Sequence, residues 1–321
     1  SAASEVYKRQ VYGRIDQDID RAIELLEKAR ETTLAENNKS HINLYVALGI
    51  KSRACLAEGD WDGAFKAAKR VIDEGGYAVG TKSDLTGGMN SLDKQNVMWG
   101  AGIQVADQAG GYAGFFTHMD NKEGAYAKSA PKLISKQLYN RISATDIRRD
   151  WWDPSDKESP YVSKKFSFAN VASFLGDYIY MRVEEMYFTA AEAALRLDDL
   201  KSARELMNTV MAERDPGYSA NNRSGTLLGA TTTTWTGSFL ENILTHRRIE
   251  LWGEYGRLFD VRRLGQGIDR RTDDGFSEEC ISMMNRRNVN ITKADTYDWV
   301  LTIPKAELDA NPNINEEDQN P

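Results

Sequence analysis

The sequence has few cysteines, no long apolar run and no excess of positive charge, and each shortage excludes a class of protein. Its two cysteines, Cys55 and Cys280, lie too far apart to indicate a disulfide framework or a zinc site, and Cys55 falls in a helical apolar pattern typical of a small core residue. No stretch approaches the roughly 18 apolar residues of a membrane-spanning helix. A signal peptide and a start Met are also missing, so we expect a processed or truncated form whose compartment the sequence does not indicate.

Positive charge is in deficit over the 321 residues. Lys and Arg total 41 against 48 Asp and Glu, which gives a formal net charge of −7. No run of Lys and Arg lies on one face. Because binding to a phosphate backbone needs a basic footprint, nucleic acid is not expected as a partner.

Catalytic and cofactor motifs are scarce. The histidines at 41, 118 and 246 are far apart in sequence and none lies in a zinc-protease pattern. There is no nucleophile elbow and no phosphate-binding loop, and the glycines at 100 and 102 lack the rest of a dinucleotide fingerprint. No twelve-residue calcium loop is present either. We therefore expect no cofactor, no metal and no enzymatic activity.

Apolar residues recur at helical spacing in several segments, which predicts amphipathic helices. The helices are predicted at 7–30, 43–58, 60–74, 181–197 and 199–213. The second and third form one helical hairpin, and the fourth and fifth form another.

The two hairpins carry matching residues at one constant offset. The matched pairs are Ala54 with Ala193, Leu56 with Leu195, Asp60 with Asp199, Ala64 with Ala203 and Val71 with Val210. Small residues at such positions let helices approach closely. The turn at 59–61, followed by an alanine at 64, is similar to the turn of a tetratricopeptide repeat. Since one hairpin cannot bury its apolar face alone, we expect the two to pack together in space.

The rest of the chain is predicted to be less regular. Residues 215–237 are predicted to form a polar loop, 239–264 a long charged helix, and the last fifty residues a largely irregular tail. The predicted fold is mostly α, with tetratricopeptide-like hairpins as a scaffold, long irregular loops and a few short strands. We expect one domain over 1–321, with the lead-in helix and first hairpin at 7–76, a loop-rich insert at 77–178, the second hairpin at 179–214, and the charged helix and tail at 238–321.

The predicted charged helix places Arg247, Glu250, Glu254 and Arg257 on one face, because they lie three or four residues apart. A glycosidase would use two carboxylates, but these must flank a sugar site several ångströms across. Arginine neighbours would also keep both glutamates ionised, which suits neither a general acid nor a base of raised pKa. An ion network with a structural role is therefore favoured over a hydrolase site.

Aromatic residues in segments predicted as loops are the candidate ligand contacts, because flat rings suit sugar faces and peptide side chains. They are Tyr112, Phe115, Phe116, Trp151, Trp152 and Trp235. Polar candidates near them are Gln108, His118, Asn121 and Asp153. The competing interpretation is that such aromatics fill an irregular core, as Trp61 and Trp99 are expected to do.

Four ordered stretches together resemble the SusD/RagB family. They are Arg182-Val183-Glu184-Glu185 with Ala191-Glu192-Ala193; Arg247 through Glu250, Leu251, Glu254, Arg257, Phe259, Asp260 and Arg263; Ile303-Pro304, Glu307, Asn311 and Asn320-Pro321; and Asp146 with Arg148. Each stretch is weak alone, and the ordered set is specific. His246 stands where the family usually has Glu, and Gly256 lies one residue later than the family's glycine.

The resemblance implies a lipoprotein on the outer face of a Gram-negative outer membrane, held through an N-terminal part that this chain lacks. Such proteins form lids on SusC-like TonB-dependent transporters. They capture glycans, or peptides in the RagB branch, without cleaving them. Because ligand residues vary within the family, the resemblance implies no numbered binding residue here. A protein-interaction module built on the hairpins, and a hydrolase using Glu250 and Glu254, are the competing hypotheses.

Overall fold

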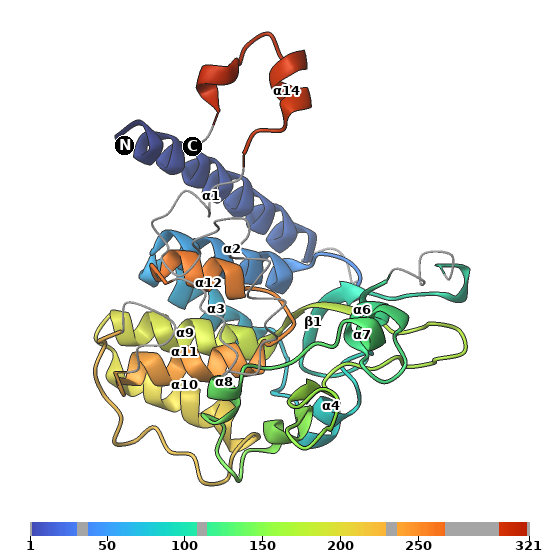
Figure 1. Cartoon of the computed structure of the whole chain (residues 1–321). Coiled ribbons are helices and arrows are strands. Elements are labelled where there is room, and N and C mark those ends of the chain that lie inside the picture. Colours follow the sequence, from blue (N-terminus) through green and yellow to red (C-terminus); the bar gives the residue numbers. More distant parts are fainter. Residues whose placement is uncertain (1, 31–37, 108–113, 229–235, 267–301, 320–321) are drawn as a thin grey trace.

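The computed structural model describes residues 2–30, 38–107, 114–228, 236–266 and 302–319. A stack of helices forms one part of the molecule, and short helices, loops and two small sheets lie beside it (Figure 1). The stack contains α1 (Ala2–Arg30), α2 (Leu44–Glu58), α3 (Trp61–Glu74), α9 (Val183–Arg196), α10 (Leu200–Ala212) and α11 (Phe239–Glu250). The predicted mostly helical fold is therefore confirmed.

The two predicted hairpins, α2 with α3 and α9 with α10, pack against each other through α3 and α9. Helix α1 covers α2, and α11 lies on α9. The repeated aspartates have the same task in both hairpins, since Asp60 accepts a hydrogen bond from the backbone N–H of Gly63 and Asp199 from that of Ser202. Each thus caps the second helix of its hairpin. Ala64 and Ala203 are fully buried, which permits the close packing of helices.

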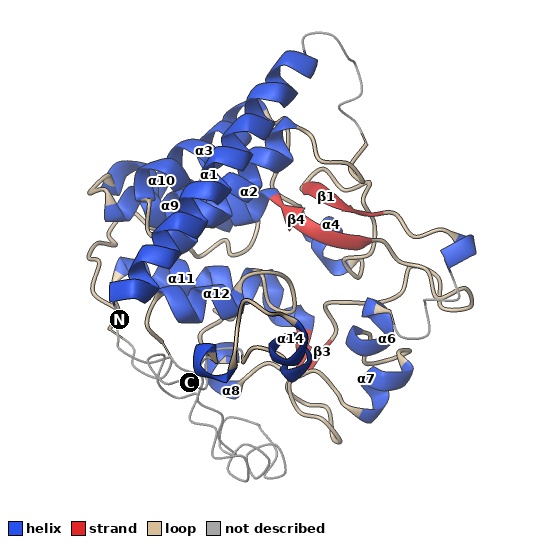
Figure 2. Ribbon diagram, turned by 90° about the horizontal axis from the view of Figure 1, so that it is seen from above, coloured by secondary structure: helices blue, strands red, loops and turns tan. Residues whose placement is uncertain are grey.

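The insert is held to the scaffold by a strand pair. Strand β1 (Val97–Ala101) pairs antiparallel with β4 (Tyr178–Arg182), and β4 continues directly into α9. The helix predicted from residue 181 therefore begins at Val183, because the preceding residues bond to β1. A second pair joins β2 (Trp152–Asp153) to β3 (Val162–Ser163). Figure 2 shows the first sheet at the edge of the helices.

The insert also contains short helices, which loops and turns connect. They are α4 (Lys82–Thr86), η1 (Val105–Asp107), α6 (Phe115–Met119), α7 (Ala125–Ser129), α8 (Lys136–Tyr139) and η2 (Ile147–Trp151). Their apolar side chains form a second buried cluster with the aromatic residues of the insert, and Ile249 of α11 joins it. This cluster ties the insert to the end of α11.

The prediction of one helix over 239–264 is wrong. Helix α11 ends at Glu250 and α12 (Arg257–Arg263) begins seven residues later. Gly253 and Gly256 lie between them with φ of 74° and 112°, a region that glycine enters without strain. The break turns residues 251–256 into a loop that faces β4 and the insert.

The C-terminal part of the described chain holds α14 (Lys305–Ala310) and η5 (Glu316–Asp318). The side-chain amide of Gln319 closes this segment, since it accepts from the backbone N–H of Ile303 at 2.7 Å and donates to that residue's carbonyl at 2.9 Å. In the described residues, no helix is long and apolar enough to span a bilayer.

Candidate functional site

A buried ion network underlies the site, with the carboxylate of Glu250 at its centre. Three guanidinium groups donate to this carboxylate over 3.0–3.1 Å, from Arg148, Arg182 and Arg214. All four side chains have no exposed surface. Although burial opposes ionisation, the three cations hold the pKa of Glu250 well below its usual value. The three arginines come from η2, β4 and the turn after α10, so the network joins the insert to the scaffold.

The network continues to Glu254, in the loop after α11. Arg182 donates two hydrogen bonds of 2.8 Å to this carboxylate, and the ammonium of Lys165 donates a third over 2.5 Å. Burial alone would raise the pKa of Glu254, but Arg182 and Lys165 lower it. Burial lowers the pKa of Lys165 to about 8. Glu254 is thus an ionised and fully paired group.

His246 also belongs to this buried region. Burial first, and then the charge of Arg148, lower the pKa of His246 well below its usual value. The imidazole is therefore neutral, and its Nδ1 accepts a hydrogen bond of 2.8 Å from Arg148.

Arg247 lies in a separate chain of ion pairs. Its guanidinium donates to Asp260 at 3.0 Å, and Asp260 pairs with Arg263, which in turn makes two bonds of 2.7 Å to Glu192. Arg257 is the first residue of α12, and burial lowers its pKa while the charge of Asp260 opposes that change. The four residues predicted on one helix face are thus divided by the helix break, because Glu250 and Glu254 face one network while Arg247 and Arg257 face the other.

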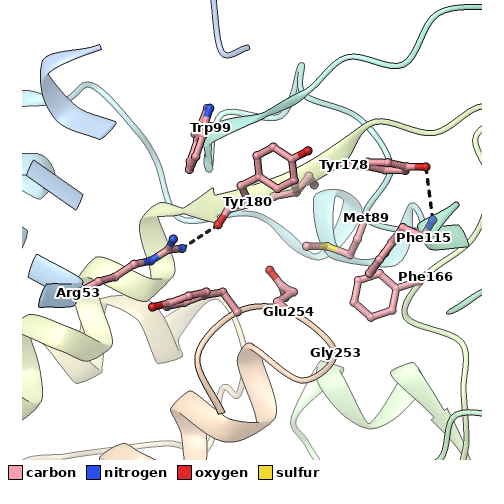
Figure 3. A pocket seen from close by; sticks show the side chains of 11 residues that line it. Arg53, Met89, Trp99, Phe115, Phe166, Tyr178, Tyr180, Gly253 and Glu254 are labelled. Carbon is pink, nitrogen blue, oxygen red and sulfur yellow. Dashed lines mark hydrogen bonds between the residues drawn. The ribbon is translucent and has the colours of Figure 1, made fainter. Parts of the chain in front are cut away.

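A cavity of about 530 Å³ opens above Glu254 (Figure 3), within the size range of small-ligand sites. We name it the aromatic pocket. It is lined by Arg53, Met89, Trp99, Phe115, Phe166, Tyr178, Ile179, Tyr180, Gly253, Glu254 and Tyr255. These residues come from α2, β1, β4, the insert and the loop between α11 and α12. The helix break thus creates one wall of the pocket.

Six rings form the walls. The rings of Trp99 and Tyr180 meet edge to face, with centroids 5.1 Å apart, and Phe115 meets Phe166 in the same way at 5.2 Å. Figure 3 shows the first pair on one side of the pocket and the second pair near Met89 on another. Tyr180 is 42% exposed, so its ring is accessible from outside. The exposed rings can stack against a flat ligand surface.

Arg53 borders the pocket opposite Phe115 and Phe166 (Figure 3). Its guanidinium lies 3.8 Å from the centre of the Tyr255 ring and makes two hydrogen bonds, of 2.8 and 2.7 Å, to Glu185. A further bond of 2.7 Å reaches the carbonyl of Tyr180. Burial opposes the charge, but Glu185 raises the pKa of Arg53 above its usual value. Arg53 therefore fixes Tyr180 and Tyr255 relative to each other.

The structure places the predicted aromatic residues in different environments. Phe115 lines the aromatic pocket. Phe116, Trp151 and Trp152 are buried, with 1–2% of their surface exposed, because they fill the core of the insert. These three are thus core side chains in the described structure. The positions at 112 and 235 lie outside the described residues, as does the polar candidate at 108.

The other polar candidates lie away from the aromatic pocket. Asn121 and Asp153 line a second, more polar cavity of about 710 Å³, which shares the ring of Phe166 with the aromatic pocket. His118 is exposed on α6, and its ring stacks on Tyr126 at 4.7 Å. The described residues of the predicted set are therefore spread over two cavities, the core of the insert and the surface.

Sequence reasoning missed most of the pocket. Trp99 was expected to be buried, yet it is only half-buried and lines the cavity. The tyrosines at 178 and 180 flank one residue just before the motif at 182–185, and such a concentration of rings was a usable signal. Nothing in the sequence links Arg53 to them, because the contact depends on how α2 packs against β4.

Paired helical hairpins that carry a ring-lined pocket between the scaffold and its insert define a helical scaffold protein. Comparison of the chain with known proteins identifies its family. The SusD family matches residues 117–321, and the chain belongs to this family. No curated protein matches the chain.

Solved structures share the fold. A SusD-like carbohydrate binding protein from Bacteroides vulgatus is 26% identical, with a TM-score of 0.69 over 92% of this chain and 64% of its own. A SusD superfamily protein from Bacteroides thetaiotaomicron is 23% identical, with a TM-score of 0.73 over 97% of this chain and 66% of its own. Surface glycan-binding protein A from Bacteroides uniformis is 16% identical, with a TM-score of 0.62 over 95% of this chain and 68% of its own. The chain thus spans about two thirds of the length of these proteins.

Proposed function

We propose that this protein captures nutrient glycans at the cell surface without cleaving them, and that the aromatic pocket is the binding site. The observation that carries the proposal is a ring-lined cavity of about 530 Å³ in a member of the SusD family. Two structural relatives support it, because their names describe carbohydrate binding and surface glycan binding.

The geometry suits a sugar ring. The C–H groups on one face of a pyranose pack against aromatic rings, while its hydroxyl groups need hydrogen-bond partners at the rim. Trp99 and Tyr180 supply the accessible rings. The hydroxyl groups of Tyr180 and Tyr255 supply donors, and burial raises the pKa of Tyr255, so its hydroxyl keeps its proton. A shallow site of this kind holds a sugar and releases it again.

The absence of cleavage is part of the proposal, and the carboxylates support it. A glycosidase needs two carboxyl groups that face each other across the scissile bond, one of which must be protonated. Glu250 has no exposed surface and three arginine partners, and the pKa of Glu254 is lowered by two cations. Neither group is available as a general acid at neutral pH.

We further propose that the full-length protein is lipid-anchored on the outer face of the outer membrane, where it delivers glycans to a SusC-like TonB-dependent transporter. Membership of the SusD family supports this step. Co-purification of the full-length protein with such a transporter from detergent-solubilised outer membranes tests it, and a protein found only in the cytoplasm would contradict it.

Peptide capture is the second candidate, because eight of the eleven lining residues are apolar or aromatic. An apolar peptide side chain would bury apolar surface of the pocket that stays in contact with water when a sugar is bound. A helical interaction module without a small-molecule ligand is the third.

One screen distinguishes these candidates. Thermal shift is measured with oligosaccharides and short peptides on the unchanged chain, on Trp99→Ala with Tyr180→Ala, and on Tyr126→Ala. The last variant removes an exposed ring outside the pocket. Saturable stabilisation by an oligosaccharide, weakened at least about tenfold in the double variant alone, supports the proposal. A response to peptides only would replace it with peptide capture, and no response would favour an interaction module.

A further inference from the structure

Both charged groups at the aromatic pocket are neutralised by the protein itself. The guanidinium of Arg53 makes two bonds to Glu185, whose side chain is 2% exposed. The carboxylate of Glu254 accepts from Arg182 and Lys165, which have no exposed side-chain surface. Neither charged group therefore offers an uncompensated charge to a ligand.

The positive and negative charges below the pocket also balance one another. The network around Glu250 contains four cations and four carboxylates that are paired with one another, and their side chains are at most 10% exposed. They are Arg148, Lys165, Arg182 and Arg214, with Asp146, Glu184, Glu250 and Glu254. The floor of the pocket thus carries no net charge that could favour an ion of either sign.

An ionised ligand group placed in this pocket would lose its hydration without gaining a counter-charge, which is unfavourable. Aromatic rings attract cations, so a ligand ammonium group is the strongest competitor. The guanidinium of Arg53, however, already occupies one face of the Tyr255 ring, 3.8 Å from its centre, so a ligand ammonium group cannot stack there. Anions are further disfavoured by the net charge of −7 on the chain.

We infer that the aromatic pocket selects uncharged sugars and rejects both acidic and amino sugars. This inference rests on the proposed function and names the ligand class within it. The residues that determine the selectivity are Glu185, Arg182 and Lys165, which act through Arg53 and Glu254. Two N–H donors remain for sugar hydroxyl groups, because no described residue accepts a hydrogen bond from Nη1 of Arg53.

Matched oligosaccharide series test the inference. Each series keeps one glycosidic linkage and contains three members, which are a neutral sugar, its 6-carboxylate form and its 2-amino form. The first series is β-1,4-linked glucose, glucuronate and glucosamine. The second is α-1,4-linked galactose, galacturonate and galactosamine, and the third is β-1,4-linked mannose, mannuronate and mannosamine. Titration calorimetry measures Kd at low and high salt. The neutral member is expected to bind at least about tenfold more tightly than both charged members, with a Kd that salt changes less than about twofold.

Two substitutions at one uncharged wall position separate charge from shape. Ile179 lies in β4 and is half-buried, so Ile179→Lys adds an unpaired cation to the wall, while Ile179→Met keeps it neutral. The lysine variant is expected to improve binding of the carboxylate member at least about tenfold relative to the neutral member, and the methionine variant to leave the ratio unchanged. Circular dichroism shows whether both variants are folded.

The outcomes separate this inference from the proposed function. A carboxylate or amino member that binds the unchanged chain more tightly overturns the inference and leaves glycan capture standing. An Ile179→Lys variant with an unchanged ratio shows that charge does not set the selectivity, which also overturns it. Absence of binding in every series, with a response to peptides, overturns both.

Discussion

Among single residues, Glu250 lies at the centre of the buried ion network, with three guanidinium groups on one carboxylate. Glu250→Gln removes the charge and keeps the shape, so three buried arginines lose their common partner. The free energy of unfolding is expected to fall by about 3–5 kcal/mol, because breaking a buried ion pair leaves charge uncompensated. Urea denaturation followed by circular dichroism measures it.

Glu205→Gln is the matched control, because that glutamate is 65% exposed on α10. Its substitution is expected to change the free energy of unfolding by less than about 0.5 kcal/mol. If Glu250→Gln were as stable as this control, the ion network would not stabilise the fold. If it lost a measurable hydrolytic activity instead, Glu250 would be catalytic.

The environment of loop aromatics was not predictable from sequence. Trp151 and Trp99 both lie in the aromatic-rich insert, yet Trp151 is 2% exposed and Trp99 lines a cavity. The indole N–H of Trp151 donates to the carbonyl of Leu85, a contact 66 positions away in sequence. Because such long-range contacts decide which ring is covered, local composition identifies the aromatic segments and not their exposure.

Among the elements, the loop between α11 and α12 decides whether the pocket exists. A Cβ atom at Gly253 would lie 2.6 Å from the ring of Phe166, and its φ of 74° strains any other residue. Gly253→Ala is expected to lower the free energy of unfolding by more than about 1 kcal/mol and to weaken ligand binding, because the wall must shift. Thermal unfolding and titration calorimetry measure the two effects.

Gly13→Ala, at another glycine, is expected to raise the free energy of unfolding. Gly13 lies inside α1 with no atom within 4 Å of an added Cβ, so alanine should stabilise the chain by about 0.5–1 kcal/mol and leave binding unchanged. Equal effects at the two positions would show that neither conformation nor contact at Gly253 matters.

The hairpins were predictable and the helix break was missed. The matched pair Asp60 and Asp199 and the small residues between the helices are local signals. In the structure the two aspartates cap the second helix of each hairpin, and the alanines at 64 and 203 are buried where the helices pack. Gly253 and Gly256 were also visible, but their charged neighbours at helical spacing suggested a continuous helix. The partners of those charges lie on β4, on η2 and in the turn after α10, which helical periodicity within one segment does not indicate.

For the whole molecule, buried carboxylates make stability depend on pH. The pKa values of Glu192, Glu250, Glu254 and Asp260 are lowered by cationic partners, although burial opposes this. The unfolded chain therefore binds more protons below about pH 4.5, so the stabilisation is present above that pH and is lost as the pH falls through the folded-state values. Urea denaturation from pH 7 to pH 3 should show a steep decline below pH 4.5.

Glu192→Gln removes one of these groups and should make the decline shallower. A free energy of unfolding that stays constant down to pH 3 would contradict the assignment of ionised, paired carboxylates to the interior.

The pocket could not be assembled from sequence, since its residues come from positions as far apart as Arg53 and Tyr255. The family resemblance predicted the helical scaffold, and the structure and the match to the SusD family confirm that prediction. The site depends on how α2, β4 and the loop after α11 meet, and that is a property of the folded chain.

Strand β4 continues into α9 without an intervening loop, and Arg182 is both the last residue of the strand and the N-cap of the helix. The same arginine is clamped by Glu250 and Glu254, so the pocket wall that holds Tyr180 has no hinge. A preformed wall gives up little conformational entropy when a ligand arrives. We therefore expect association to proceed as a single kinetic step, with ligand size rather than rearrangement of the protein limiting its rate.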